Sequence, residues 1–336
     1  MSIQTRTRYD ALDVMKFLCA IFVVVIHCKP LQPYSDFLNV LTAEGICRIA
    51  VPFFFCTSGL LLAERLTADQ LSDRQICKQA LISNIRLYAL WSIAYLLLSI
   101  YGRIHYHTLE MWYINNLLRN LVIDGGSYYH FWYLLAMIYA MPLMPWLARR
   151  KSLTLVLMAI PLWTLRCLQF VYRWVPFIDI PWDTPFDTLR DAACCAVPMM
   201  AMGILCLRFR HRRSPKFWLL CAAVSGAVNL MELLLLYFRT AHTGHFEFLF
   251  TTPFVVFCLV NYLAAVDFSF ADQRIPLTLR QASVWIYCIH PMLIFLYSLL
   301  HDSTGIRRFL IILPLCLVSS LGYIRFRSAH KNKRRN

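Results

Sequence analysis

The sequence contains few charged residues. Asp, Glu, Lys and Arg make up only 15% of the 336 residues, whereas 59% are hydrophobic. Soluble domains contain about 45–50% apolar residues. This shortage of charge excludes a large soluble domain and is typical of a protein that crosses a membrane many times. A chain of this length can hold about ten spans of ~20 residues with short connections.

Sequence features of several other protein classes are missing. None of the 13 cysteines belongs to a Cys-x-x-Cys pair that is accompanied by a second pair or by spaced histidines. Neither a metal site nor a disulfide framework is therefore predicted. We find no internal repeat and no low-complexity tract. The lack of an Asp-His-His-Cys motif argues against a palmitoyltransferase of that kind.

What the sequence does contain is a series of ten hydrophobic segments, each of which we interpret as a membrane span. They are Leu12–Cys28, Ile46–Ala63, Leu81–Tyr101, Tyr129–Leu147, Leu153–Val171, Ala192–Leu207, Phe217–Phe238, Phe248–Val266, Ser283–Leu300 and Phe309–Ile324. Pro161, Arg166 and Pro198 interrupt the fifth and sixth, but spans tolerate proline when neighbouring groups satisfy the freed carbonyls. We therefore predict an all-α integral membrane protein, a bundle of about ten transmembrane helices.

Basic residues between the segments predict the orientation. With the N-terminus placed in the cytoplasm, 21 of the 33 Lys and Arg residues lie on the cytoplasmic side and 9 on the other. Cytoplasmic loops carry such an excess of basic residues. We predict a membrane protein with both termini cytoplasmic, in contact with membrane lipids, and with a basic cytoplasmic tail over 327–336. The net charge of +15 follows from this distribution, so no nucleic-acid partner is predicted.

Three further expectations concern the ends and loops. Arg6 and Arg8 precede an apolar run as in a signal peptide, but no small-x-small cleavage site follows Pro30, so an uncleaved first span is expected. The connection 102–128 is amphipathic enough for a short helix on the membrane surface. The connection 172–190 carries tryptophans and aspartates that could bind a sugar, although an interfacial aromatic belt is the commoner explanation.

The first segment carries an ionisable residue at each end. Lys16 and His27 are eleven residues apart, which on an α-helix places them within roughly 20° of one face and roughly 16 Å apart along the axis. Ionisable groups in a span cost a few kcal/mol and usually face a bundle interior or a cavity. A single such histidine is more often structural than catalytic, so the interpretation depends on the whole set of polar residues.

The other polar residues of the spans fall at similar depths. His130, Arg166, Asp191 and Glu232 lie toward the predicted outer side, Arg86 and Asn84 toward the inner side, and His290 near the middle of the ninth span. Arg86 alone could extend to the inner interface. Together, these residues predict a polar cavity through the bundle, because histidine can accept a proton near neutral pH and a basic residue can bind a phosphate.

Four stretches resemble the acyltransferase family 3 membrane proteins. The first span has Asp13, Lys16 and His27 in the family's Asp, Leu-Arg-like and terminal His pattern. Arg48–Gly59 is similar to the family's Val-Pro-Phe-Phe-x-x-Ser-Gly stretch, and Tyr129–Leu134 to its His-Leu-Trp-Phe-Leu segment. Ser283–Pro291 matches its Ser-x-x-x-Tyr-x-x-His-Pro segment. The matches occur in family order, so a single domain over 9–326 is expected.

The resemblance implies a membrane O-acyltransferase, which we expect in the bacterial inner membrane. Such a protein moves an acyl group, usually acetyl from acetyl-CoA, to a hydroxyl of a cell-envelope carbohydrate or lipid-linked sugar, and needs no tightly bound cofactor. We expect His27 as the general base, oriented by Glu232 or Asp191, and Lys16 with Arg86 at the CoA donor. The expected cavity residues are Ser58, His130, Trp132, Asp191 and His290. Two positions depart from the family pattern: Lys16 replaces an arginine, and Ser83 stands where the first arginine of the third-span pair would be.

Two alternatives stay open at this point. The same architecture could serve a non-catalytic transporter or sensor that binds no CoA, which the Lys16 and Ser83 departures favour. A different membrane acyltransferase architecture, centred on a mid-membrane histidine, would use His290. Direct acetyl-CoA binding separates the first alternative from the enzyme, and separate substitution of His27 and His290 tests the second.

Overall fold

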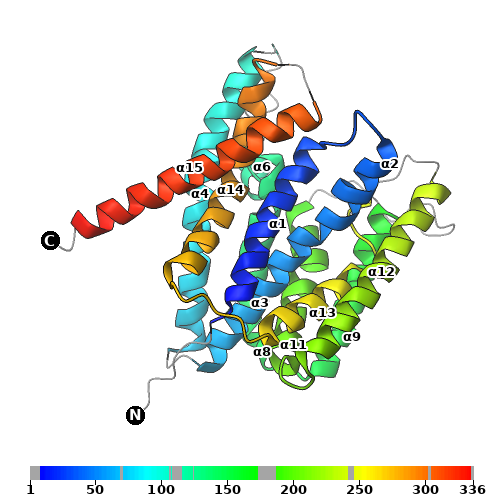
Figure 1. The fold of residues 1–336 in the computed structure, drawn as a ribbon. Coiled ribbons are helices and arrows are strands. Elements are labelled where there is room, and N and C mark those ends of the chain that lie inside the picture. The colour runs from blue at the N-terminus through cyan, green and yellow to red at the C-terminus, as the bar shows by residue number, and fades with distance from the viewer. Residues whose placement is uncertain are drawn as a thin grey trace.

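The structure is a computed structural model that describes residues 8–68, 71–105, 107, 116–123, 125–172, 187–240, 246–301 and 304–333. Every regular element in these ranges is a helix, which confirms the all-α prediction (Figure 1). The α-helices are α1 Asp10–Cys28, α2 Asp36–Asn39, α3 Ala50–Ala68, α4 Asp73–His105, α6 Leu117–Val122, α7 Trp132–Ala140, α8 Met144–Ala148, α9 Ser152–Phe170, α10 Asp187–Asp191, α11 Val197–Phe209, α12 Pro215–Arg239, α13 Thr252–Ala265, α14 Arg274–Ser298 and α15 Ile306–Lys333. Short 3₁₀ or π turns link several of them: η1 Val40–Gly45, η2 Ile46–Ile49, η3 Tyr129–Phe131, η4 Met141–Leu143 and η5 Ala192–Ala196.

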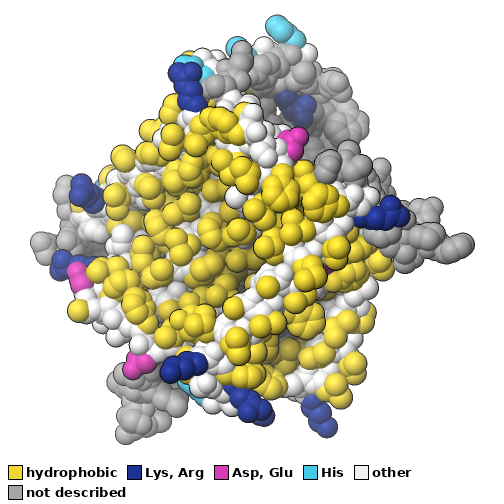
Figure 2. All heavy atoms as spheres, turned by 45° about the vertical axis from the view of Figure 1, so that its right-hand side comes forward, with side chains coloured by type: hydrophobic (Ala, Val, Ile, Leu, Met, Phe, Trp, Pro, Cys, Tyr) yellow, Lys and Arg dark blue, Asp and Glu magenta, His cyan; other side chains and the backbone are white. Residues whose placement is uncertain are grey.

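The helices agree with the predicted spans. In the described part of the chain, nine helical stretches are long and apolar enough to cross a membrane, and α13 is a shorter apolar helix. Each of the ten predicted segments coincides with one of these. Figure 2 shows one face of the molecule covered by hydrophobic side chains, with charged side chains around its edges. Such a face fits the hydrocarbon core of a bilayer.

The eighth span differs from its predicted extent. α13 begins only at Thr252 and has 14 residues, which gives roughly 21 Å against a hydrocarbon core of about 30 Å. Residues 246–251 before it form no helix, although Phe246, Phe248 and Leu249 are buried. A hydrophobic run indicates that residues are buried but not that they are helical, so the predicted span began too early.

The predicted loop features are only partly within the described residues. α6 supplies a helix in the connection 102–128, while Trp112 and Tyr113 lie outside the described residues. Most of the connection 172–190, with its tryptophans, also lies outside them. At the C-terminus α15 continues to Lys333, so most of the predicted basic tail is helical.

The core of the bundle contains an unusually close contact between α3 and α11. A Cβ atom added to Gly203 would lie 2.1 Å from the carbonyl oxygen of Cys56, and one added to Gly59 would lie 2.2 Å from that of Met200. Only glycine allows two helix backbones to approach so closely, as in the small-residue interfaces of membrane helices. These helices form a fixed central contact around which the other spans pack.

α1 packs along α14, and both run in the same direction. α1 ends at Cys28 because Lys29 adopts the left-handed conformation, with its N–H donating to the carbonyl of Val25. Arg308 of α15 donates to the carbonyls of His27 and Cys28. This cation at the end of the helix satisfies carbonyls that would otherwise lack partners. The last turn of α1, which carries His27, is therefore fixed.

Candidate active site

Basic side chains gather around a cavity at the N-terminal end of α1. The cavity has a volume of about 390 Å³. Its charged lining residues are Arg8, Asp13, Lys16, Glu64, Arg65 and Arg280, which come from four different parts of the chain. Four cations and two carboxylates leave a positive excess. We call this space the inner cavity.

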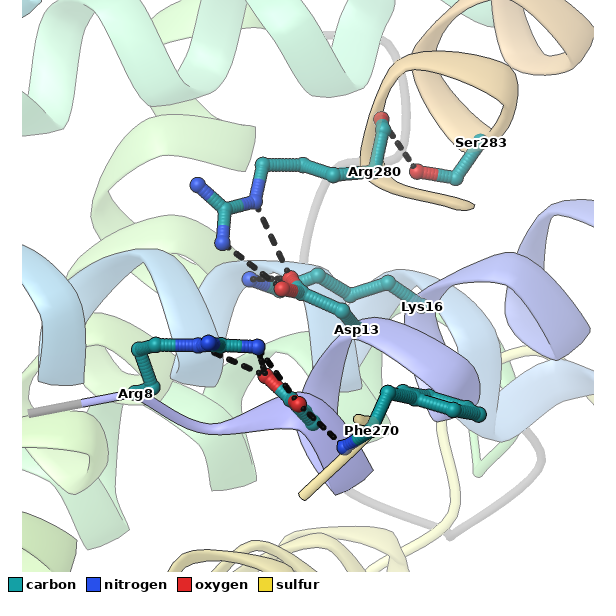
Figure 3. A network of polar contacts seen from close by, with 7 residues as sticks. Arg8, Asp13, Lys16, Phe270, Arg280 and Ser283 are labelled. Atoms are coloured by element: carbon teal, nitrogen blue, oxygen red, sulfur yellow. Dashed lines mark hydrogen bonds and ion pairs between the residues drawn. The ribbon is translucent and has the colours of Figure 1, made fainter. Parts of the chain in front are cut away.

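Asp13 holds two of these cations in place. Its carboxylate accepts from Arg280 at 2.7 and 3.2 Å and lies 3.7 Å from the Lys16 ammonium (Figure 3). Asp13 itself is buried, whereas the side chain of Arg280 is 58% exposed. The neighbouring Asp10 binds Arg8 and accepts from the backbone N–H of Phe270. α1 is thereby tied to the segment that leads into α14.

A second cavity continues from the first. It has a volume of about 210 Å³ and shares Lys16, Ser58 and Arg280 with the inner cavity. Its remaining lining is mostly apolar or aromatic, with a few hydroxyl and amide groups: Phe54, Thr57, Asn84, Leu87, Tyr133, Leu134, Met137, Ser283, Val284 and Tyr287. We call it the middle cavity. An elongated molecule with an anionic end could occupy both.

Three histidines lie together beyond the middle cavity. The ring centroids of His27 and His290 are 5.2 Å apart and stacked, and those of His130 and His290 are 5.6 Å apart. Tyr287 lines the middle cavity and donates to the carbonyl of His130. His130 and His290 are buried, and among the described residues neither nitrogen of His130 nor Nε2 of His290 has a hydrogen-bond partner. The histidine cluster therefore contains buried ring nitrogens without a protein partner among the described residues.

A third cavity lies on the other side of the histidines. It has a volume of about 330 Å³. Its lining combines aromatic and charged side chains with two glycines: Gly125, Gly126, Tyr128, Tyr129, Trp132, Arg166, Arg190, Asp191, Glu247 and Phe248. The ring of Tyr129 is 4.9 Å from the ring of His27. We call this space the outer cavity. The ring of Tyr129 lies between it and His27.

Comparison with known proteins places the chain in a family. The sequence model of the acyltransferase 3 family, described as an acyltransferase domain, matches residues 9–325. The chain belongs to the acyltransferase 3 family. The matched residues include both the cationic cavity and the three histidines.

Matches to curated proteins cover a smaller part of the chain. An amino-acid racemase of Enterococcus faecalis is 30% identical over 133 residues, which are 39% of this chain and 17% of that protein. A serine/alanine racemase of Enterococcus gallinarum is 34% identical over 131 residues, 38% of this chain and 18% of that protein. The chain thus matches less than a fifth of the length of these relatives. No solved structure matches the chain.

The structure brings most of the predicted site residues together. Lys16 and Ser58 line the inner and middle cavities, His27, His130 and His290 form the histidine cluster, and Trp132 and Asp191 line the outer cavity. Arg86, which we expected at the CoA donor, is the exception. It is exposed on α4 and is not among the residues that line these three cavities.

Sequence reasoning missed Arg280, which was counted only as a loop charge. Its signal is a spacing. Arg280, Ser283, Tyr287 and His290 follow one another at intervals of three, four and three residues, which places them on one face of α14. That face lies against the stripe of α1 that carries Lys16 and His27, so the two helices supply both ends of the site.

Glu232, which we expected to orient His27, forms its hydrogen bonds elsewhere. It accepts from the backbone N–H groups of Phe250 at 2.7 Å and Thr251 at 3.0 Å, and it also binds the hydroxyls of Thr251 and Tyr172. These bonds satisfy the irregular backbone before α13, which a membrane environment requires. That backbone carries Glu247 and Phe248 into the outer cavity. Glu232 is therefore placed to position the cavity wall.

Replacing Glu232 by alanine is expected to destabilise the protein by about 1–3 kcal/mol, because two partly buried N–H groups lose their acceptor. Thermal unfolding of the purified protein in detergent measures the change. Asp267→Ala, which removes an exposed carboxylate, is the matched control and should leave the midpoint unchanged. Equal midpoints for both variants would contradict the anchoring role.

Proposed function

We propose that this protein is an O-acyltransferase that moves an acetyl group from acetyl-CoA in the cytoplasm to a hydroxyl of a cell-envelope carbohydrate or lipid-linked sugar. One observation carries the proposal. The parallel pairing of α1 and α14 places Lys16 with Arg280 at one depth and His27 with His290 at another, with the middle cavity between them. The two depths suit two substrates that arrive from opposite sides of the inner membrane.

The inner cavity is the proposed donor end. CoA carries phosphates, and Arg guanidinium groups bind phosphate through two parallel hydrogen bonds. Arg280 lines the cavity beside Lys16, and its Nε and Nη2 bind Asp13, so its Nη1 is the group that would bind a phosphate. Arg280 would thus supply the guanidinium that the family has at the position of Lys16. Arg8 and Arg65 add further positive charge. The acyl end of the donor would then extend through the middle cavity toward the histidines.

His27 is the proposed general base. The acceptor oxygen attacks the thioester carbonyl carbon while His27 takes the hydroxyl proton. The carbon–sulfur bond breaks, and the CoA thiolate leaves and is protonated. Holding both substrates in register and removing the proton are the two effects that this site offers. The stacked ring of His290 limits the orientations of the His27 ring.

A transporter or sensor is the second candidate function. It is favoured by the exposure of Arg86 on α4 and by Ser83 in the position of the family's other third-span arginine. Such a protein would keep the polar cavities but would not bind CoA. Direct binding of labelled acetyl-CoA to the purified protein distinguishes the two.

Replacing Arg280 by glutamine is expected to weaken acetyl-CoA binding about tenfold, because one charge-assisted phosphate contact is lost. Equilibrium binding of labelled acetyl-CoA to the purified protein measures the effect. Arg86→Gln is the matched control and should bind like the wild type, because Arg86 is exposed and lies outside the lining of the cavities. No acetyl-CoA binding by the wild type would favour the transporter. A large loss in Arg86→Gln with none in Arg280→Gln would move the donor site to α4.

A further inference from the structure

Arg166 of α9 is a buried cation in the wall of the outer cavity. It is only 4% exposed. Its Nη2 lies 2.9 Å from a carboxylate oxygen of Asp191. Among the described residues, its Nε and Nη1 have no hydrogen-bond partner. Burying guanidinium N–H groups without acceptors costs free energy. Arg166 therefore has buried N–H donors that an acceptor on a ligand would stabilise.

Aromatic rings fix the position of this guanidinium. Its central carbon lies 4.5 Å from the ring centroid of Phe248 and 5.1 Å from that of Phe170. Phe248 belongs to the segment that Glu232 anchors. Arg166 therefore cannot simply turn toward solvent, and a ligand in the outer cavity meets it in a set orientation.

Asp191 lies beside two guanidinium groups in this wall. Its Oδ1 lies 2.9 Å from Arg166 and 3.7 Å from Nε of Arg190. The contact with Arg166 is made to Nη2, so Asp191 leaves the Nε and Nη1 groups of Arg166 without an acceptor among the described residues. Glu247, the other acid in the lining, is 3.0 Å from Arg48.

We propose that the outer cavity is a binding site for an anionic acceptor, and that Arg166 binds the carboxylate or phosphate of that acceptor. The anion site stands on the geometry of Arg166, and its assignment to the acceptor rests on the proposed function. Tyr129 lines the cavity and contacts His27. A hydroxyl on the same molecule can therefore lie toward the base while its anionic group binds Arg166. This narrows the acceptor from carbohydrates in general to acidic or phosphorylated ones.

Binding of three small probes to the purified protein tests the site. Methyl β-D-glucuronoside carries a carboxylate, glucose 1-phosphate carries a phosphate, and methyl β-D-glucoside is neutral. We expect the wild type to bind at least one of the two anions about tenfold more tightly than the neutral probe, as for a charge-assisted contact in a buried site. The anion that binds more tightly shows whether the site prefers a carboxylate or a phosphate on the acceptor.

Two variants should change this preference in opposite directions. Arg166→Gln is expected to abolish it. Asp191→Asn removes the internal competitor for Arg166, so it is expected to keep or increase the preference. Arg149→Gln, on an exposed side chain that pairs with Asp73, is the control and should match the wild type. A purely structural Arg166–Asp191 pair would instead make both variants less stable without altering the preference.

Several outcomes would overturn the proposal. These are an equal affinity of the wild type for all three probes, an unchanged preference in Arg166→Gln, or a loss of preference in Asp191→Asn. If Arg166→Gln does not fold, the result for Asp191→Asn decides. The binding readout is independent of catalysis. An anion preference without acetyl transfer would refute the proposed function and leave the anion site, whereas wild-type transfer to a neutral acceptor by Arg166→Gln would refute the site alone.

Discussion

Membranes that contain His27→Ala are expected to transfer labelled acetyl groups from acetyl-CoA about 10²–10⁴-fold more slowly than wild-type membranes, the usual contribution of a general base. Binding of acetyl-CoA should persist, because Lys16 and Arg280 lie at the other cavity. The measurement is the label recovered in envelope glycans, with purified protein used for binding. A loss of both binding and transfer would indicate a structural defect instead.

His290→Ala and Cys28→Ala complete this experiment. Cys28 adjoins His27 but points about 100° away on the helix, so its loss should leave transfer near the wild-type level. His290 stacks on His27, so its loss should slow transfer less than the loss of His27. A larger effect for His290→Ala would assign the base to His290. Full transfer by His27→Ala would end the proposed role of His27.

Replacing Gly203 by leucine is expected to prevent the protein from folding, or to cost more than about 3 kcal/mol in a folded variant, because overpacking here meets backbone atoms. Even a Cβ would lie 2.1 Å from the carbonyl of Cys56 and 2.5 Å from the backbone nitrogen of Leu60. No side-chain rotation relieves such a contact. The yield of monodisperse protein in detergent and its thermal midpoint measure the loss.

Gly226 provides the matched control. It is also a helix-interior glycine, and a Cβ added there meets nothing within 4 Å. Gly226→Leu should fold with a midpoint equal to or above that of the wild type, since leucine favours a helix over glycine by a fraction of a kcal/mol up to ~1 kcal/mol. Similar damage from both substitutions would show that the α3–α11 contact is not special.

Hydrophobic runs predicted most of the fold. A span leaves a long local signal, so all ten segments coincide with helices. The late start of α13 left no such signal. Phe248 and Leu249 are buried without being helical, and the acceptor for the backbone beyond them is Glu232, about twenty residues earlier on α12. A partner brought in by tertiary packing cannot be read from the segment itself.

The site was predictable where its residues share one helix. The eleven-residue spacing put Lys16 and His27 on one stripe, and both lie toward α14. Arg280 could have been found by the same reasoning, because it extends the face of α14 that ends at His290. Arg8 and Arg65 could not, since they reach the inner cavity from the ends of different elements. Arg86 shows the converse, because only packing decides whether a cation in a span faces a cavity.

Because α1 and α14 pack in parallel, the number of residues between the two site positions on each helix sets the geometry of the site. Lys16 and His27 are eleven residues apart, while their counterparts Arg280 and His290 are ten apart. One inserted residue between Lys16 and His27 would turn the histidine by about 100° and raise it by about 1.5 Å. The imidazole would leave His290 while the cation stayed beside Arg280. The segment of α1 between Lys16 and His27 can therefore accept substitutions, but an insertion or a deletion within it would separate the two ends of the site.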